Sequence, residues 1–192
     1  MRLLVGPTGS GKTVMLSQSL REHPGHSLYV CASVETPLLR SIAKAAGTRE
    51  DLNAVLEAMH ARPIRLLAID EAENCDDNDE QVLEMMLSDE RCSGLLVASR
   101  RRSIVSERLI ANGVVSMCTQ RMLRFDADEC TKMAAGMGLE IDASLATHLA
   151  EVCDGWPIAI AGTLRTARTM QLDILEALER WKSDQRSVVL DF

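Results

Sequence analysis

The fold of this chain is decided by GPTGSGKT at residues 6–13. This stretch matches the pattern G-x-x-x-x-G-K-[ST], and it lies between an apolar run at 2–6 and a helical pattern at 12–22. Glycines at positions 6, 9 and 11 permit positive φ angles, so successive backbone N–H groups can face one concave surface. Such a surface at a helix N-terminus binds phosphate. The motif therefore predicts a phosphate-binding loop between a buried strand and a helix.

The same pattern assigns roles within the loop. The expected cofactors are ATP or ADP with Mg²⁺. Lys12 is expected to reach the β- and γ-phosphates, and the Thr13 hydroxyl is expected to coordinate Mg²⁺. A chance glycine-rich turn is the alternative, but the flanking strand and helix favour the phosphate-binding interpretation. The predicted nucleotide contacts from this loop are Gly6, Pro7, Thr8, Gly9, Ser10, Gly11, Lys12, Thr13 and Val14.

A second apolar run, LLAIDEAE at 66–73, is typical of a Walker B strand. Asp70 lies at its carboxyl end, where ligands bind in open α/β sheets, and it is expected to hold Mg²⁺, partly through water. Glu71 is then placed to polarise the water that attacks the γ-phosphate. The alternative is a buried strand that ends in a solvated acidic turn.

Apolar runs alternate with helical patterns over the first two thirds of the chain, which predicts a parallel sheet with helices on both faces. We expect an α/β core of the P-loop NTPase type at 1–125, followed by a small all-helical subdomain at 126–183. The apolar tail at 184–192 is interpreted as the start of a further domain. The expected strands lie at 2–6, 27–32, 64–70, 94–99 and within 114–125.

Composition narrows the function classes. The 192 residues carry a net charge of −7, which argues against a surface that wraps nucleic acid. No apolar run is long enough to cross a membrane. The six cysteines are scattered without a C-x-x-C pair, and the four histidines lack metal-ligand spacing. We therefore expect a cytoplasmic protein with reduced thiols.

A third apolar run, GLLVASRR at 94–101, ends in Ser99 and Arg100. A cationic side chain at the end of this strand can sense whether a γ-phosphate is present. From the residues alone, a strand that enters a basic surface loop is nearly as good an interpretation. Arg101 and Arg102 are expected to be solvated.

Two of these features together carry a resemblance to a known family. LLVASR at 95–100, followed by a helical stretch that contains DGWPIAI at 154–160, resembles the STAND class of signal-transduction ATPases. Within that class the chain is most similar to the nucleotide-binding module of MalT/LuxR-type transcriptional regulators, and more distantly to NB-ARC domains. The Asp70-Glu71 pair leans instead towards the AAA+ form of the Walker B motif.

The resemblance implies roles for further residues. Arg100 would sense the γ-phosphate, and Pro157 would pack against the adenine side and link a helical lid to the nucleotide. It also implies an ATP-binding and slowly hydrolysing switch that reports to attached regulatory domains, with DNA involved only indirectly. A nucleotide-dependent homo-oligomer is among the expected assemblies. Because the chain starts at the first strand, we expect an excised module or a minimal relative.

Two other function classes stay open at this point. One is an AAA+ accessory ATPase of DNA transposition or repair, in which Arg108 or Arg121 would act on a neighbouring copy. The other is a small-molecule kinase, which the lack of a recognisable acceptor-binding lid with paired arginines disfavours.

Overall fold

The computed structural model describes residues 1–189, with side chains through residue 183. The chain divides into two compact units, Met1–Met122 and Leu123–Phe192. No helix in the described part is long and apolar enough to cross a membrane.

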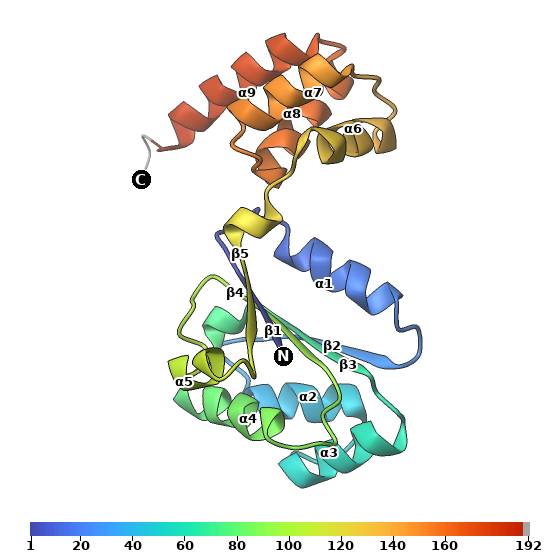
Figure 1. Ribbon diagram of the computed structural model, residues 1–192, viewed down its shortest axis with the longest axis vertical. Helices are drawn as coiled ribbons and strands as arrows, with labels where there is room; N and C mark the ends of the chain where they lie inside the picture. The colour runs from blue at the N-terminus through green and yellow to red at the C-terminus, as the bar shows by residue number, and fades with distance from the viewer. Residues whose placement is uncertain (190–192) are drawn as a thin grey trace. The chain divides into compact units, whose positions relative to one another are not determined.

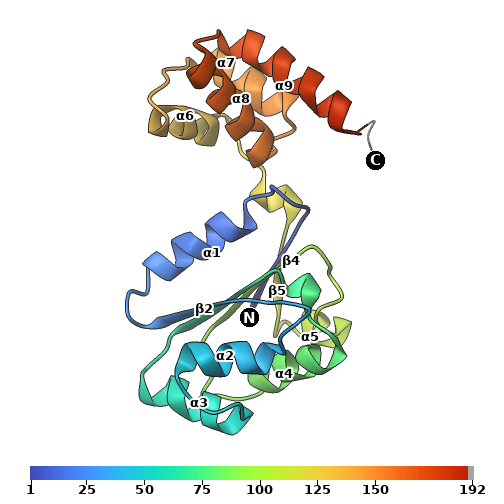
Figure 2. The ribbon, with the colours of Figure 1, turned by 180° about the vertical axis from the view of Figure 1, so that it is seen from behind.

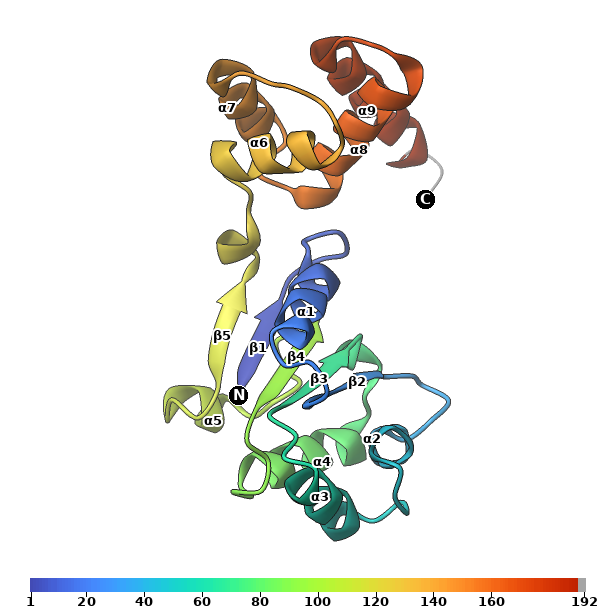
Figure 3. The same cartoon turned by 90° about the vertical axis from the view of Figure 1, so that its right-hand side faces the viewer.

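The first unit is built on a parallel sheet, as predicted. Its strands run in the order β2-β3-β4-β1-β5, and Figure 3 shows them in this order. All neighbouring strands pair in parallel. The strands are β1 (Arg2–Val5), β2 (Ser27–Cys31), β3 (Leu66–Asp70), β4 (Leu95–Ser99) and β5 (Ser116–Thr119).

Helices cover both faces of this sheet (Figures 1 and 2). One face carries α1 (Lys12–Arg21), and the opposite face carries the remaining α-helices of the unit. These are α2 (Leu38–Ala46), α3 (Leu52–Ala61), α4 (Asp77–Leu87) and α5 (Glu107–Ala111). Two short 3₁₀ helices, η1 (Ala72–Asn74) and η2 (Gln120–Leu123), follow β3 and β5.

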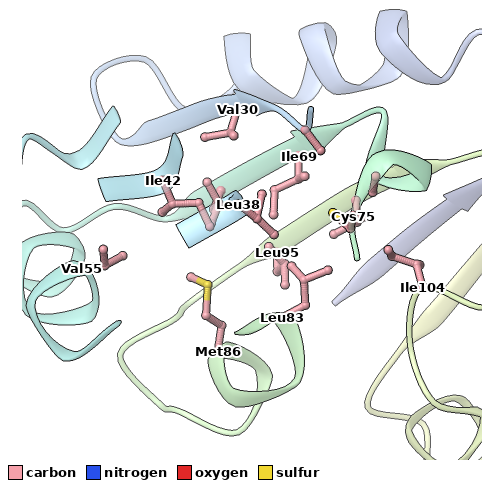
Figure 4. Packing of buried hydrophobic residues seen from close by; sticks show 14 of the residues in the cluster. Val30, Leu38, Ile42, Val55, Ile69, Cys75, Leu83, Met86, Leu95 and Ile104 are labelled. Carbon is pink, nitrogen blue, oxygen red and sulfur yellow. The ribbon is translucent and has the colours of Figure 1, made fainter. Parts of the chain in front are cut away.

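Successive residues of each strand point to opposite faces, so the strands feed two separate apolar clusters. Leu4 and Leu96 pack with Leu16 of α1, whereas Leu3 and Ile69 belong to the larger cluster beneath the other helices. Figure 4 shows this larger cluster, in which side chains from the sheet meet those of α2, α3 and α4. Burial on both faces explains why the inner strands β3 and β4 are nearly continuous apolar runs in the sequence.

The parallel arrangement places three functional segments at one edge of the sheet. The glycine loop follows β1, Asp70 closes β3, and Arg100 follows β4. Because β4 lies between β1 and β3, the carboxyl ends of these strands are neighbours. This edge is where ligands bind in open α/β sheets.

The second unit is helical and has its own apolar cluster. It contains α6 (Ala127–Gly136), α7 (Ala143–Val152), α8 (Pro157–Met170) and α9 (Ile174–Val189). Asp126 and Glu129 form a capping box at the start of α6, and Asp142 caps α7. Pro157 opens α8, as its tolerance at a first helical turn predicts.

We expected the helical part to end at residue 183 and a tail to follow at 184–192. The backbone of α9 continues through Val189. Residues 190–192 lie outside the described part of the chain.

Candidate active site

The glycine loop has the conformation that its sequence predicts at two of three positions. Gly9 and Gly11 adopt φ angles of 79° and 91°, a region that favours glycine. We also expected a positive φ at Gly6, and this prediction is wrong. Gly6 instead lies close to Ser10, because a Cβ atom at position 6 would lie 2.7 Å from the Ser10 Oγ atom and would force that side chain to shift. That hydroxyl is buried and has no hydrogen-bond partner within the described residues.

Lys12 folds back onto its own loop. Its Nζ atom donates to the carbonyl oxygens of Gly6 at 2.7 Å and Pro7 at 3.0 Å, and the residue is only 9% exposed. Burial lowers the pKa of Lys12, whereas the negative charges of Glu73 and then Asp70 oppose this shift. The ammonium group is thus held inside the loop by weak neutral acceptors that an anionic phosphate can replace.

Thr13 and Asp70 meet although 57 residues separate them in the chain. The Thr13 hydroxyl donates to Asp70 Oδ2 at 2.7 Å, and the backbone N–H of Glu71 donates to Asp70 Oδ1 at 2.9 Å. Asp70 is 4% exposed. A hydroxyl and a carboxylate side by side are hard oxygen ligands, the chemistry that Mg²⁺ prefers, so these residues fit the ion that the motif implies.

Glu71 lies directly after the strand in a strained backbone conformation, with a φ angle of 52°. Cys31, at the end of the neighbouring β2, donates its thiol to Glu71 Oε2 at 3.5 Å. Partial burial, followed by the hydrogen bond and charge of Glu71, raises the pKa of Cys31 to about 11. The side chain expected to polarise water therefore has a neighbour that stays protonated at neutral pH.

Arg100 lies just after β4, as predicted, but its guanidinium is already paired. Its Nε atom donates to Glu73 Oε1, and its backbone N–H donates to Glu73 Oε2 at 2.9 Å. Arg101 is exposed, as expected, and it also donates to the carbonyl oxygen of Cys75 at 3.0 Å.

The acidic residues that follow Glu71 do not form a simple solvated turn, which is the alternative interpretation of this segment. Asp76 caps α4 by accepting from the backbone of Asn78 and Asp79. Asp79 is buried and accepts from the backbone N–H of Leu38 at 2.7 Å, so it satisfies the start of α2. Sequence reasoning missed Glu73 and Asp79 because both partners are distant in the chain. Their only local signal is the density of carboxylates after the strand.

Two further predicted nucleotide contacts are Val14 in the first unit and Pro157 in the second unit. Val14, at the start of α1, is 59% exposed. Pro157 opens α8, and Gly155 before it adopts a φ angle of 61° while its carbonyl oxygen accepts from the backbone N–H of Phe125. The positive φ angle of Gly155 thus favours glycine at this position. The contact of Pro157 with a nucleotide stays a prediction.

This geometry agrees with the comparison to protein families. A family model described as "AAA domain" matches residues 1–100, which is half of the chain and includes both the glycine loop and the acidic strand end. The chain belongs to the AAA domain family. Membership of this family implies nucleotide binding, typically with Mg²⁺, and suggests ATP hydrolysis.

Three solved structures share the fold of this AAA domain at low sequence identity. A RuvB variant from Thermotoga maritima shares 18% identity with a TM-score of 0.58, covering 93% of this chain and 61% of its own. Domain III of the replication initiation protein DnaA from the same organism shares 17% identity (TM-score 0.57), covering 95% and 83%. A Walker-type ATPase of Pyrococcus abyssi shares 12% identity (TM-score 0.63), covering 99% and 68%.

These likenesses establish the fold of the AAA domain. Its chain spans about three fifths of the RuvB structure that it matches. A search of curated proteins gave no match.

Proposed function

We propose that this AAA domain binds ATP with Mg²⁺ and hydrolyses it slowly, as a molecular switch. The observation that carries the proposal is the meeting of Thr13 and Asp70 beside the glycine loop. Two segments with separate sequence signals converge on the same point, and each supplies the oxygen ligand that a nucleotide-bound Mg²⁺ needs.

The side chains divide the chemistry among them. Lys12 exchanges its carbonyl partners for the β- and γ-phosphates, and backbone N–H groups of the loop donate to the phosphate oxygens. Thr13 and Asp70 would hold Mg²⁺, which when bound neutralises charge on the phosphate oxygens. Glu71 orients and polarises the attacking water, and Arg100 stabilises charge that develops at the γ-phosphate.

We further propose that the switch is regulatory, as in the STAND class. A switch needs contacts that differ between its two nucleotide states. Arg100 supplies one such contact on the first unit, and the helical unit, which contains Gly155-Trp156-Pro157, would act as a lid through Pro157. Attached regulatory domains would then sense whether ATP or ADP is bound.

Phosphate release from ATP tests the proposal. Wild-type protein with Mg²⁺ is expected to turn over slowly, whereas Glu71→Gln is expected to lose hydrolysis by about 10²-fold or more while it still binds ATP. Glu90→Gln removes the same charge from an exposed position and should keep the wild-type rate. Equal rates in the wild-type and Glu71→Gln proteins would refute the role of Glu71.

A second candidate is a DNA-associated ATPase that works as an oligomer. It is favoured by the fold shared with a protein that is named for replication initiation, and by the frequent oligomerisation of AAA domains. Arg108 and Arg121 are exposed and could reach the site of a neighbouring copy. ATP-dependent assembly on DNA, measured by light scattering and gel shift, would favour this candidate over the regulatory switch.

A further inference from the structure

Glu73 is an acidic residue within the candidate site to which no motif assigns a role. It lies in η1, directly after Asp70 and Glu71, and its side chain is only 11% exposed. Both carboxylate oxygens are engaged by one residue, since Arg100 donates its Nε atom to Oε1 and its backbone N–H to Oε2. Glu73 therefore holds the backbone and the side chain of Arg100 at once.

The carboxylate of Glu73 lies among the groups that a triphosphate requires. Arg100 follows β4, the strand next to the one that enters the glycine loop. Glu73 follows Asp70, which accepts from Thr13, by three residues, and it pairs with Arg100, the cation that is expected to sense a γ-phosphate.

This carboxylate is ionised at neutral pH. Partial burial on its own would raise the pKa of Glu73, but hydrogen bonds from its own backbone N–H, from the backbone N–H of Arg100 and from the Arg100 guanidinium outweigh burial and lower it. Arg100 is therefore paired with an anion whose charge is fixed at neutral pH.

We propose that Glu73 is a specificity-determining residue that competes with the γ-phosphate of ATP for Arg100. The inference rests on the proposed function and deepens it. ATP must displace Glu73 from the guanidinium before Arg100 can contact the γ-phosphate. ADP has no γ-phosphate and leaves the Arg100–Glu73 pair intact. Glu73 therefore lowers the affinity for ATP relative to ADP.

The Arg100–Glu73 ion pair contributes little to the stability of the fold. The Arg100 side chain is 56% exposed, and ion pairs with an exposed partner contribute little to folding because water screens them. Its position at the end of β4, where it meets an anion within the site, is better explained by exchange between two anions of similar chemistry. Arginine binds carboxylate and phosphate with the same planar set of donors.

The test measures the dissociation constants of ADP and of a non-hydrolysable ATP analogue, both with Mg²⁺, by calorimetry. Glu73→Gln is expected to raise the preference for the ATP analogue over ADP by about two- to five-fold, the range for a partly exposed ion pair. Glu80→Gln is the matched control, because Glu80 belongs to the same acidic segment but faces Arg101. The preference of Glu80→Gln for the ATP analogue over ADP should equal that of the wild type.

A double variant separates competition for Arg100 from general repulsion. If Glu73 acts through Arg100, Glu73→Gln should change the preference in the wild type but not in an Arg100→Ala background. Equal tightening of both nucleotides, an unchanged preference or weaker binding of the ATP analogue would overturn the inference.

Two further arms keep the test decisive. Should Glu73→Gln not fold, as judged by circular dichroism, Glu73→Asp keeps the charge but shortens the reach to Arg100. It should also raise the preference, and an unchanged preference would overturn the inference. Absence of any nucleotide binding in the wild type would refute the proposed function and this inference together, whereas normal binding with an unchanged preference refutes only the role of Glu73.

Discussion

At the scale of single residues, the charged side chains of the candidate site are hydrogen-bonded to other groups of the same site. Lys12 rests on two carbonyl oxygens, the carboxylate of Asp70 accepts from Thr13, and Arg100 is held by Glu73. Each of these partners is one that a phosphate or a magnesium ion can replace. Binding of MgATP would therefore exchange these internal partners for phosphate oxygens and the metal ion.

The thiol of Cys31 offers a test of the charge around Glu71. Its pKa is raised to about 11, so at pH 8 only a small fraction is thiolate, and thiolate is the reactive form. Alkylation of Cys31 by iodoacetamide is therefore expected to be slow at pH 8, although the residue is exposed. The rate should rise by about tenfold per pH unit up to pH 9.5, as read by mass spectrometry of its peptide.

Glu71→Gln gives the comparison for this measurement. It removes the hydrogen-bonding anion but leaves the burial, which is the larger cause of the shift, so alkylation should become faster while remaining slower than that of a free thiol. A Cys31 that reacts quickly at pH 8, with no further rise at higher pH, would contradict the described surroundings of Glu71.

At the scale of elements, the sequence predicts what is encoded in contiguous residues. Strands β3 and β4 are apolar runs because they are buried on both faces, and the glycine loop and the end of β3 carry their chemistry within a few positions. The Asp79–Leu38 and Glu73–Arg100 contacts could not be predicted in this way, since they depend on which strands become neighbours. The strand order depends on packing between distant segments, so it cannot be predicted from any single segment of the sequence.

The packing of α8 against α9 depends on a glycine that sequence reasoning did not single out. A Cβ atom at Gly162 would lie 2.3 Å from Nε1 of Trp181. The Trp181 ring packs edge-to-face with the Trp156 ring, and the two ring centroids are 6.4 Å apart. Gly162→Ala is therefore expected to destabilise the protein by about 1–3 kcal/mol through overpacking, despite the better helix propensity of alanine. Chemical denaturation followed by tryptophan fluorescence measures the change.

Gly136 in α6 provides the matched control. A Cβ atom there meets nothing within 4 Å, so Gly136→Ala should stabilise the protein by up to about 1 kcal/mol through helix propensity alone. Stabilisation by both substitutions would show that α8 and α9 are not packed as closely as described.

At the scale of the whole molecule, the two units have separate apolar clusters, and the chain passes between them near residues 122 and 123. If the helical unit acts as a lid, the connecting segment should be less accessible when ATP is bound. Arg121 and Arg124 are exposed cleavage sites for trypsin at this point. Cleavage there is expected to be slower with Mg²⁺ and a non-hydrolysable ATP analogue than with ADP.

Arg49 serves as the internal control for this experiment. It lies between α2 and α3 within the first unit, is exposed, and should be cleaved at the same rate in both nucleotide states. Equal cleavage at Arg121 and Arg124 with either nucleotide would refute the lid, but it would leave ATP binding at the glycine loop untouched.

The central claim is that the loop at Gly6–Thr13 binds ATP with Mg²⁺, and calorimetric titration of Lys12→Ala tests it most directly. Loss of a charged hydrogen-bond donor to phosphate is expected to weaken MgATP binding by about tenfold or more, whereas Lys44→Ala, at an exposed site in α2, should bind as the wild type does. Unchanged affinity of Lys12→Ala for MgATP would contradict the assignment of this loop as the nucleotide site.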